Sequence, residues 1–309
     1  MEVGGKRERR VEYAEANTAR VEADQALLRR TVAARVGGAY WAAAGAVRVQ
    51  ALLNEEKQNL LRVVRYTESR VKEGAAAGAD LLRIQLEAQR VDALLAAAEQ
   101  ESERTRVSLY REIGIEPPQT VEFSDALELL RDVSVPEASA VIDRRPEVVL
   151  ARRAVAQAEA NLKLQQANAR PDPDFVLGYK RTAGFDTIIA GVQINLPTRN
   201  RNQGLIAAAE AELRGARENV RAIETLVAAE LQASARDYEL KRRLVSGELP
   251  SMVERAKDSS RISQYAFREG GVDLLRLLDA ERTRIETQLM YSRSLIEFQQ
   301  SAVALAVAA

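Results

Sequence analysis

Two related stretches of sequence decide the fold of this chain. The first reads KEGAAAGADLLRIQLEAQR at residues 72–90, and the second reads REGGVDLLRLLDAER at residues 268–282. The two stretches lie about 195 residues apart, and the residues upstream of them also correspond, Val11 and Ala14 with Ile206 and Ala209. An internal repeat of this kind shows that the fold contains one supersecondary unit twice.

Each copy predicts a long helix, a glycine-containing turn and a second helix. Residues 8–72 contain no proline and carry apolar residues seven apart, which predicts a helix of roughly 100 Å with a heptad seam. The corresponding helix of the second copy is expected from about 204 to 269, where Pro250 should kink or restart it. The turns lead into helices at 80–111 and 272–307, and a further helix at 146–169 begins with Pro146.

Composition excludes several classes of function. The 45 basic and 45 acidic residues cancel, so no field attracts nucleic acid. Without any Cys or His the chain has no thiol or imidazole catalysis and lacks the usual zinc and copper ligands. Asp172 and Asp174, in RPDPD, fit turn residues better than a metal-binding pair. We therefore expect neither an enzyme nor a cofactor or metal site.

Residues 174–197 change to a period of two, which predicts a β-hairpin with its turn at AGFD, 183–186. One face gathers apolar side chains, and the other gathers small or polar ones such as Lys180, Gln193 and Asn195. The apolar face includes Phe175, Leu177, Tyr179, Val192 and Ile194. This alternation fits a membrane β-barrel with lipid outside and water inside, and it also fits a soluble hairpin packed on a core.

The two glycine turns are the strongest candidates for a functional site. In both, Asp-Leu-Leu-Arg follows glycine, so that the glycine permits the reversal, the aspartate caps the next helix and the leucines begin its seam. Two equivalent helical tips also suit a docking surface, and both interpretations stay open. The candidate docking residues are Gly74, Asp80, Leu81, Leu82, Gly270, Gly271, Asp273, Leu274 and Leu275.

Four segments together carry a resemblance to a known family. They are MEVGGKRERRVEYAEA at 1–16, RPEVVLARRAVAQAEANL at 145–162, GVQINLPTRNRNQGLIAAAEAEL at 191–213 and YAFREGGVDLLRLLDAERTR at 265–284. The chain resembles the TolC family of outer-membrane efflux proteins over essentially its whole length. The first and third segments look most like the branch that serves heavy-metal resistance pumps of the cobalt-zinc-cadmium type.

The resemblance implies a mainly helical fold with a small β part. Long antiparallel helical hairpins would form the wall of an α-barrel, and the strands would join a transmembrane β-barrel that trimerisation completes. It implies a passive channel without cofactor in the bacterial outer membrane, spanning the periplasm and exporting substrates that include heavy-metal cations. Its partners would be outer-membrane lipid, a periplasmic adaptor (membrane fusion protein) and an inner-membrane pump of the RND type. The alternative is a soluble or periplasmic coiled-coil structural or adaptor protein.

The repeat sets the expected domain boundaries. Residues 1–112 form the first repeat with its tip near 73–80, residues 113–145 an equatorial connector, and residues 146–309 the second repeat with its tip near 268–273. The family closes its channel at the periplasmic end, which points to Tyr265, Glu269, Asp273 and Arg276 as candidate gate residues. Family members begin with a secretion signal, a short helix and two strands, so we expect this chain to be truncated at its N-terminus.

Overall fold

The computed structural model describes residues 4–116, 122–130, 132–134, 137, 141–194 and 200–309. The chain divides into two compact units. Unit 1 combines Met1–Arg30 with Pro136–Glu230, and unit 2 combines Thr31–Val135 with Leu231–Ala309. Two helices, α1 at Lys6–Lys72 and α5 at Gln203–Arg243, contribute residues to both units.

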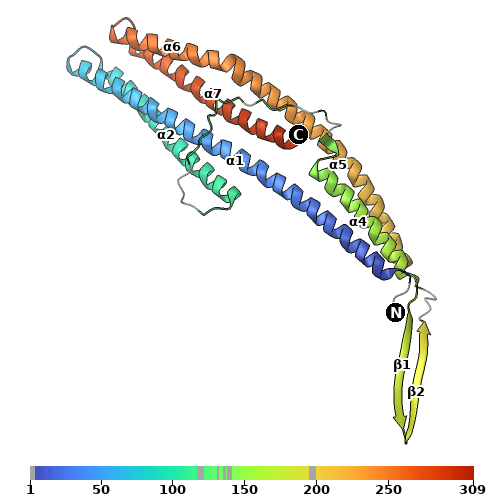
Figure 1. Cartoon of the computed structure of the whole chain (residues 1–309). Helices are drawn as coiled ribbons and strands as arrows, with labels where there is room; N and C mark the ends of the chain where they lie inside the picture. Colours follow the sequence, from blue (N-terminus) through green and yellow to red (C-terminus); the bar gives the residue numbers. More distant parts are fainter. Residues whose placement is uncertain (1–3, 117–121, 131, 135–136, 138–140, 195–199) are drawn as a thin grey trace. The chain divides into compact units, whose positions relative to one another are not determined.

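Helices make up most of the described chain, as Figure 1 shows. The predicted mainly helical fold with a small β part is therefore confirmed. No helix among the described residues is both long and apolar enough to cross a membrane. The remaining elements are α2 at Gly78–Ile113, α4 at Pro146–Asn168, β1 at Pro173–Thr182, β2 at Phe185–Ile194, the π-helical turn η1 at Leu244–Glu248, α6 at Leu249–Arg268 and α7 at Leu274–Ala308.

Pro250 interrupts the long helix of the second copy, as the sequence predicts. It lies in the first turn of α6, directly after the five-residue π-helical turn η1. Proline has no backbone N–H to donate and its ring crowds the preceding turn, so the regular helical ladder cannot continue unchanged. The wider π turn accommodates this mismatch, so the helix continues beyond it.

In unit 1, α4 lies alongside α1 and α5 (Figure 1). Lys163 of α4 donates to Glu12 of α1 at 2.5 Å, and Arg217 of α5 donates to Glu159 of α4 at 2.8 Å. The buried side of α4 carries small residues, among them Ala151 and Ala158. Small side chains let helices pack through a thin seam without a thick core, and the surface ion pairs flank that seam.

The hairpin of unit 1 has a two-residue turn. Ala183 and Gly184 both have positive φ, 55° and 89°, as a type I′ turn requires. Phe185 consequently pairs with Thr182 as a strand residue. The predicted turn at 183–186 was therefore too long, because the tight turn needs only its two central residues.

The strand register confirms which residues share a face. Phe175 pairs with Val192, and the register also places Leu177, Tyr179 and Ile194 on that face, because directly opposite residues project to the same side. Every residue of β2 is exposed, so the described chain leaves this apolar face uncovered. The end of the predicted hairpin at 195–197, including Asn195, lies outside the described residues.

Helices α1, α2, α6 and α7 all contribute to an apolar core in unit 2. Its members share near-complete burial, and Figure 1 shows α2 alongside α1 and α6 alongside α7. The core contains Leu53 and Leu60 of α1, Ile84, Val91, Leu95 and Ala98 of α2, Phe267 of α6, and Leu274, Leu277, Leu278 and Ile285 of α7. The two helical hairpins therefore share a core.

Glycines on α1 allow α7 to approach closely in unit 2. A Cβ atom at Gly45 would lie 2.1 Å from Cγ1 of Ile296, and one at Gly37 would lie 2.9 Å from Cγ1 of Val303. Neither distance leaves space for a methyl group. The missing side chains are thus a packing requirement of the α1–α7 contact.

Gly45→Ala should therefore destabilise the protein by about 1–3 kcal/mol, the usual range for overpacking a closed seam. Gly38→Ala is the matched control, because its Cβ would meet nothing within 4 Å. The control should be neutral or gain up to about 1 kcal/mol from helix propensity. Urea unfolding of both variants checks this, and equal effects would contradict the close approach.

Candidate functional site

The second helical tip joins α6 to α7 through a closely bonded turn. The N–H of Gly271 donates to the carbonyl of Ala266 at 2.8 Å, and the N–H of Gly270 donates to that of Phe267 at 3.2 Å. Gly270 has a φ of +77°, which glycine adopts without strain. These bonds complete a Schellman motif at the end of α6.

Asp273 caps the helix that follows. Its Oδ1 accepts from the backbone N–H of Arg276 at 2.9 Å, which confirms the predicted cap. The carboxylate also places a negative charge at the positive end of the α7 dipole. Hydrogen bonds therefore satisfy backbone groups at both helix ends of the second tip.

The first helical tip has the same turn but a different cap. Gly74 has a φ of +72°, and Ala75 donates its N–H to the carbonyl of Arg70 at 2.7 Å. The cap position of α2 is Ala77, which offers no side-chain hydrogen bond. The prediction that Asp80 caps this helix was therefore wrong. The cap follows the left-handed glycine by three residues in both tips, so Ala77 corresponds to Asp273, and Asp80 lies one turn into α2.

Burial separates the predicted tip leucines. Leu274 lies in the core of unit 2 at 4% exposure and Leu81 is half-buried, whereas Leu82 and Leu275 are 70% and 55% exposed. Of the predicted tip leucines, Leu82 and Leu275 are therefore the two whose side chains a partner could reach. The candidate gate residues Tyr265, Glu269, Asp273 and Arg276 are all exposed.

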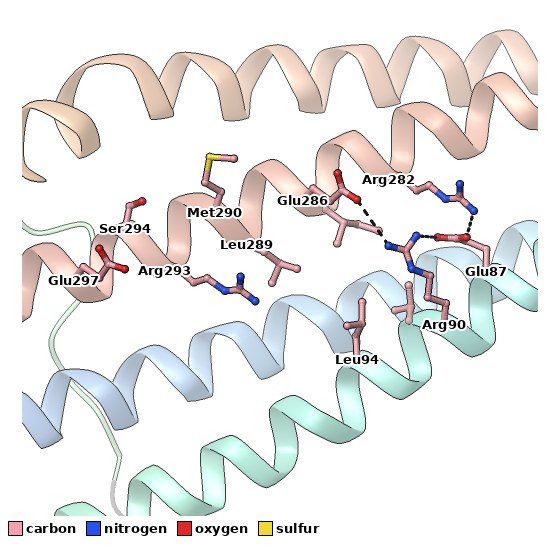
Figure 2. Close-up of a pocket in the computed structure, with 12 residues that line it drawn as sticks. Glu87, Arg90, Leu94, Arg282, Glu286, Leu289, Met290, Arg293, Ser294 and Glu297 are labelled. Atoms are coloured by element: carbon pink, nitrogen blue, oxygen red, sulfur yellow. Dashed lines mark hydrogen bonds and ion pairs between the residues drawn. The ribbon is translucent and has the colours of Figure 1, made fainter.

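A row of ion pairs joins α2 to α7. Arg282 of α7 donates to Glu87 of α2 at 2.5 Å, and Arg90 of α2 contacts Glu87 at 3.3 Å and Glu286 of α7 at 3.8 Å. The hydrogen bond to Glu87 raises the pKa of Arg282 and so keeps the guanidinium charged. Figure 2 shows these pairs at one end of a groove between the two helices, which Leu94 and Leu289 also line.

A second, more buried cluster lies between α1, α6 and α7. Arg284 of α7 binds Glu56 of α1 and also Glu281 of its own helix, at 2.9 Å. Ser260 and Gln264 of α6 donate to Oε1 of Glu281 at 2.8 and 2.6 Å. Three helices therefore meet at one cluster around a single guanidinium group.

The sequence pattern did not predict this cluster, although the heptad rows contain a signal for it. Glu56 follows Leu53 by three residues and precedes Leu60 by four, which is a seam position. Glu281 stands in the same relation to Leu278 and Ile285. A carboxylate at a seam position requires a buried partner, and the sequence offers no means of choosing Arg284 before the helices are paired.

Asp273→Ala should cost about 0.5–2 kcal/mol, because it removes a side-chain cap. Asp80→Ala should cost less, because Asp80 acts only through the helix dipole. Hydrogen exchange of the first amides of α7 and α2 measures both effects. A larger loss of protection at α2 in Asp80→Ala would contradict the assignment of the caps.

Comparisons with known proteins support one fold over the whole chain. No protein-family model matches. The cobalt-zinc-cadmium resistance protein CzcC of Cupriavidus metallidurans is 24% identical over 305 residues, which cover 98% of this chain and 73% of that protein.

Solved structures agree with the sequence comparison. The structure of CusC superimposes with a TM-score of 0.84 at 16% identity, over 99% of this chain and 74% of that one. The outer-membrane channel CmeC of Campylobacter jejuni gives 0.86 at 14% identity, over 100% of this chain and 68% of that one. The chain therefore has the fold of these outer-membrane channels, as the resemblance of its sequence to the TolC family predicts.

Proposed function

We propose that the protein is the outer-membrane channel component of a tripartite efflux system. In this role it is a passive conduit through which substrates leave the periplasm or an attached pump, and no catalytic residue or cofactor takes part. The observation that carries the proposal is the uncovered apolar face of the β-hairpin, in a chain whose fold is that of outer-membrane channels.

The apolar face of the hairpin is unfavourable in contact with water. Leu177, Ile188 and Phe175 are 82%, 76% and 65% exposed, and the register places them on one face. Removing apolar surface from water stabilises by about 25 cal/mol per Å², so this face is better placed in lipid. The opposite face carries Lys180 and Gln193, which suit a water-filled lumen.

The end of the apolar face resembles a membrane–water boundary. The hydroxyl of Tyr179 donates to Asp186 at 2.5 Å, and Arg181 pairs with Asp186 at 3.4 Å. An aromatic ring with charged groups beyond it is the arrangement found where a barrel strand leaves the hydrocarbon region. At the end near the turn, the apolar face therefore stops at polar side chains.

The need for backbone hydrogen bonds supports assembly of several copies of the chain into one β-barrel. The described strands pair only with each other in a two-stranded sheet, so each has an outer edge with no neighbouring strand among the described residues. Such edges are too costly in lipid, and a closed barrel satisfies them with strands from other copies of the chain. A homotrimer, the arrangement implied by the family resemblance, supplies those strands.

The helical tips are the proposed docking end for a periplasmic adaptor (membrane fusion protein), which links the channel to an inner-membrane RND-type pump. Leu82 and Leu275 provide exposed apolar contacts beside hydrogen-bonded turns. The gate is proposed at the second tip, where Tyr265, Glu269, Asp273 and Arg276 are exposed.

The similarity to a cobalt-zinc-cadmium resistance protein supports heavy-metal cations as the exported class. The division of the chain into repeats at 1–112 and 146–309, with an equatorial connector at 113–145, stays a prediction.

Adjacent residues on opposite faces of β2 test the membrane assignment. Val192→Arg should cost about 2–4 kcal/mol if the residue faces the bilayer midplane, whereas Gln193→Arg should cost much less in a lumen. We expect Val192→Arg to lose most of the heat-modifiable oligomer from the outer-membrane fraction while Gln193→Arg retains it. Equal losses would count against the barrel, and recovery of the wild-type protein as a soluble coiled coil would overturn it.

Charged substitutions at the exposed leucines test the docking surface. The double variant Leu82→Glu and Leu275→Glu should abolish pump-dependent metal resistance and adaptor cross-linking, while oligomers persist in the outer membrane. The matched control replaces both leucines with Met, which keeps the apolar contact and should retain resistance. Survival of cross-linking in the glutamate variant would show that the adaptor docks elsewhere.

A further inference from the structure

Glu56 is a buried carboxylate whose hydrogen bonding is incomplete. It lies in α1 at 2% exposure, and one carboxylate oxygen, Oε2, is bound by Arg284. The other oxygen, Oε1, is buried without a hydrogen-bond partner. A buried acceptor that is left unsatisfied costs about 1–3 kcal/mol, and more when it is charged.

Charge is also unbalanced around this residue. Arg284 is shared by two carboxylates, Glu56 and Glu281, so the cluster carries one excess negative charge when both are ionised. Glu281 is fully satisfied, because Ser260 and Gln264 bind one oxygen and Arg284 binds the other. The excess charge therefore belongs to Glu56.

The helices packed around Glu56 offer it no second cation among the described side chains. Facing it from α7 are Arg284 and Glu281, and from α6 come the neutral Ser260 and Gln264. On α2, Glu87 is already held by Arg282 and Arg90. On α1 itself, Lys57 is directed to Asp92 of α2, and the neighbouring Asn59 is uncharged.

We propose that Glu56 is a proton-binding site whose occupancy sets how firmly α7, and with it the second helical hairpin, is held against α1. A metal ion is the less suitable ligand, because no group of three metal-binding side chains occurs among the described residues and a guanidinium already occupies the cluster. A proton removes the excess charge and leaves Arg284 and Glu281 as a neutral pair.

Burial raises the pKa of the Glu56 carboxyl, Arg284 opposes that shift, and repulsion from Glu281 adds to it. The folded protein therefore binds this proton more tightly than the unfolded chain does. Stability from this group is fully present below the unfolded value of about 4.3 and is lost as the pH rises through the higher native value. Acid should tighten the seam, and rising pH should loosen it.

The position of the cluster connects it to the second tip. Glu281 lies eight residues after Asp273, or about 12 Å along α7. When Glu56 is ionised, the excess charge favours entry of water between α1 and α7 and weakens the hold on α7 near the tip. An effect on gating rests on the proposed function, whereas proton binding by Glu56 does not.

Glu56→Gln tests the site, because glutamine imitates the protonated carboxyl in size and charge. The matched control is Glu55→Gln, which removes an exposed carboxylate one residue away. In detergent solution, wild type and the control should gain at least ~2 °C in Tm between pH 8 and pH 5.5. The Glu56→Gln protein should show a nearly constant and higher Tm over that range. The infrared C=O band of a protonated carboxyl should appear at pH 5.5 in wild type and be absent from Glu56→Gln.

A pH response of Tm in Glu56→Gln equal to that of the control would overturn the proposal. The same infrared C=O band in wild type and in Glu56→Gln at pH 5.5 would also overturn it.

Conductance in planar bilayers separates this proposal from the proposed function. If Glu55→Gln channels close more often at pH 5.5 than at pH 8 and Glu56→Gln channels do not respond, the site regulates gating. Equal pH responses of the two variants would refute that role. Absence of conductance in every variant would count against the channel function and leave the Tm and infrared tests decisive for the proton site.

Discussion

The thin seam between α1 and α7 is the constraint on which the structure of unit 2 depends. Gly37 and Gly45 leave no space for a methyl group against Val303 and Ile296, so the two helices approach more closely than larger side chains would allow. The same seam buries Glu56 and Arg284. Close packing thus brings the two helical hairpins together, and it also buries a carboxylate that lacks a full set of partners.

The hairpin of unit 1 obeys a different physical rule. Its apolar face is not covered by the described chain, so its stability depends on an outside phase or on other chains. The helices, in contrast, form backbone hydrogen bonds within themselves, and apolar seams and ion pairs hold them together. A chain that combines both solutions is suited to a channel that is part membrane barrel and part helical conduit, which is the proposed function.

Local features of the fold could be predicted from the sequence, and long-range ones could not. Pro250 interrupts its helix and Asp273 caps the next one because each effect depends on a few neighbouring residues. The cap predicted at Asp80 was wrong. The prediction matched the Asp-Leu-Leu motif of the two tips, but the cap position of α2 is Ala77, three residues after Gly74. The Glu56–Arg284 contact joins residues 228 positions apart, so it requires the pairing of helices that no local pattern specifies.

The central claim, that this chain assembles into an outer-membrane channel, is tested most directly by electron cryomicroscopy of the detergent-extracted protein. We expect a particle with threefold symmetry in which β1 and β2 belong to one closed barrel, with Val192 on its outer surface and Gln193 on its inner surface. A water-soluble particle in which the hairpin packs on helices of its own chain, with no closed barrel, would contradict the claim.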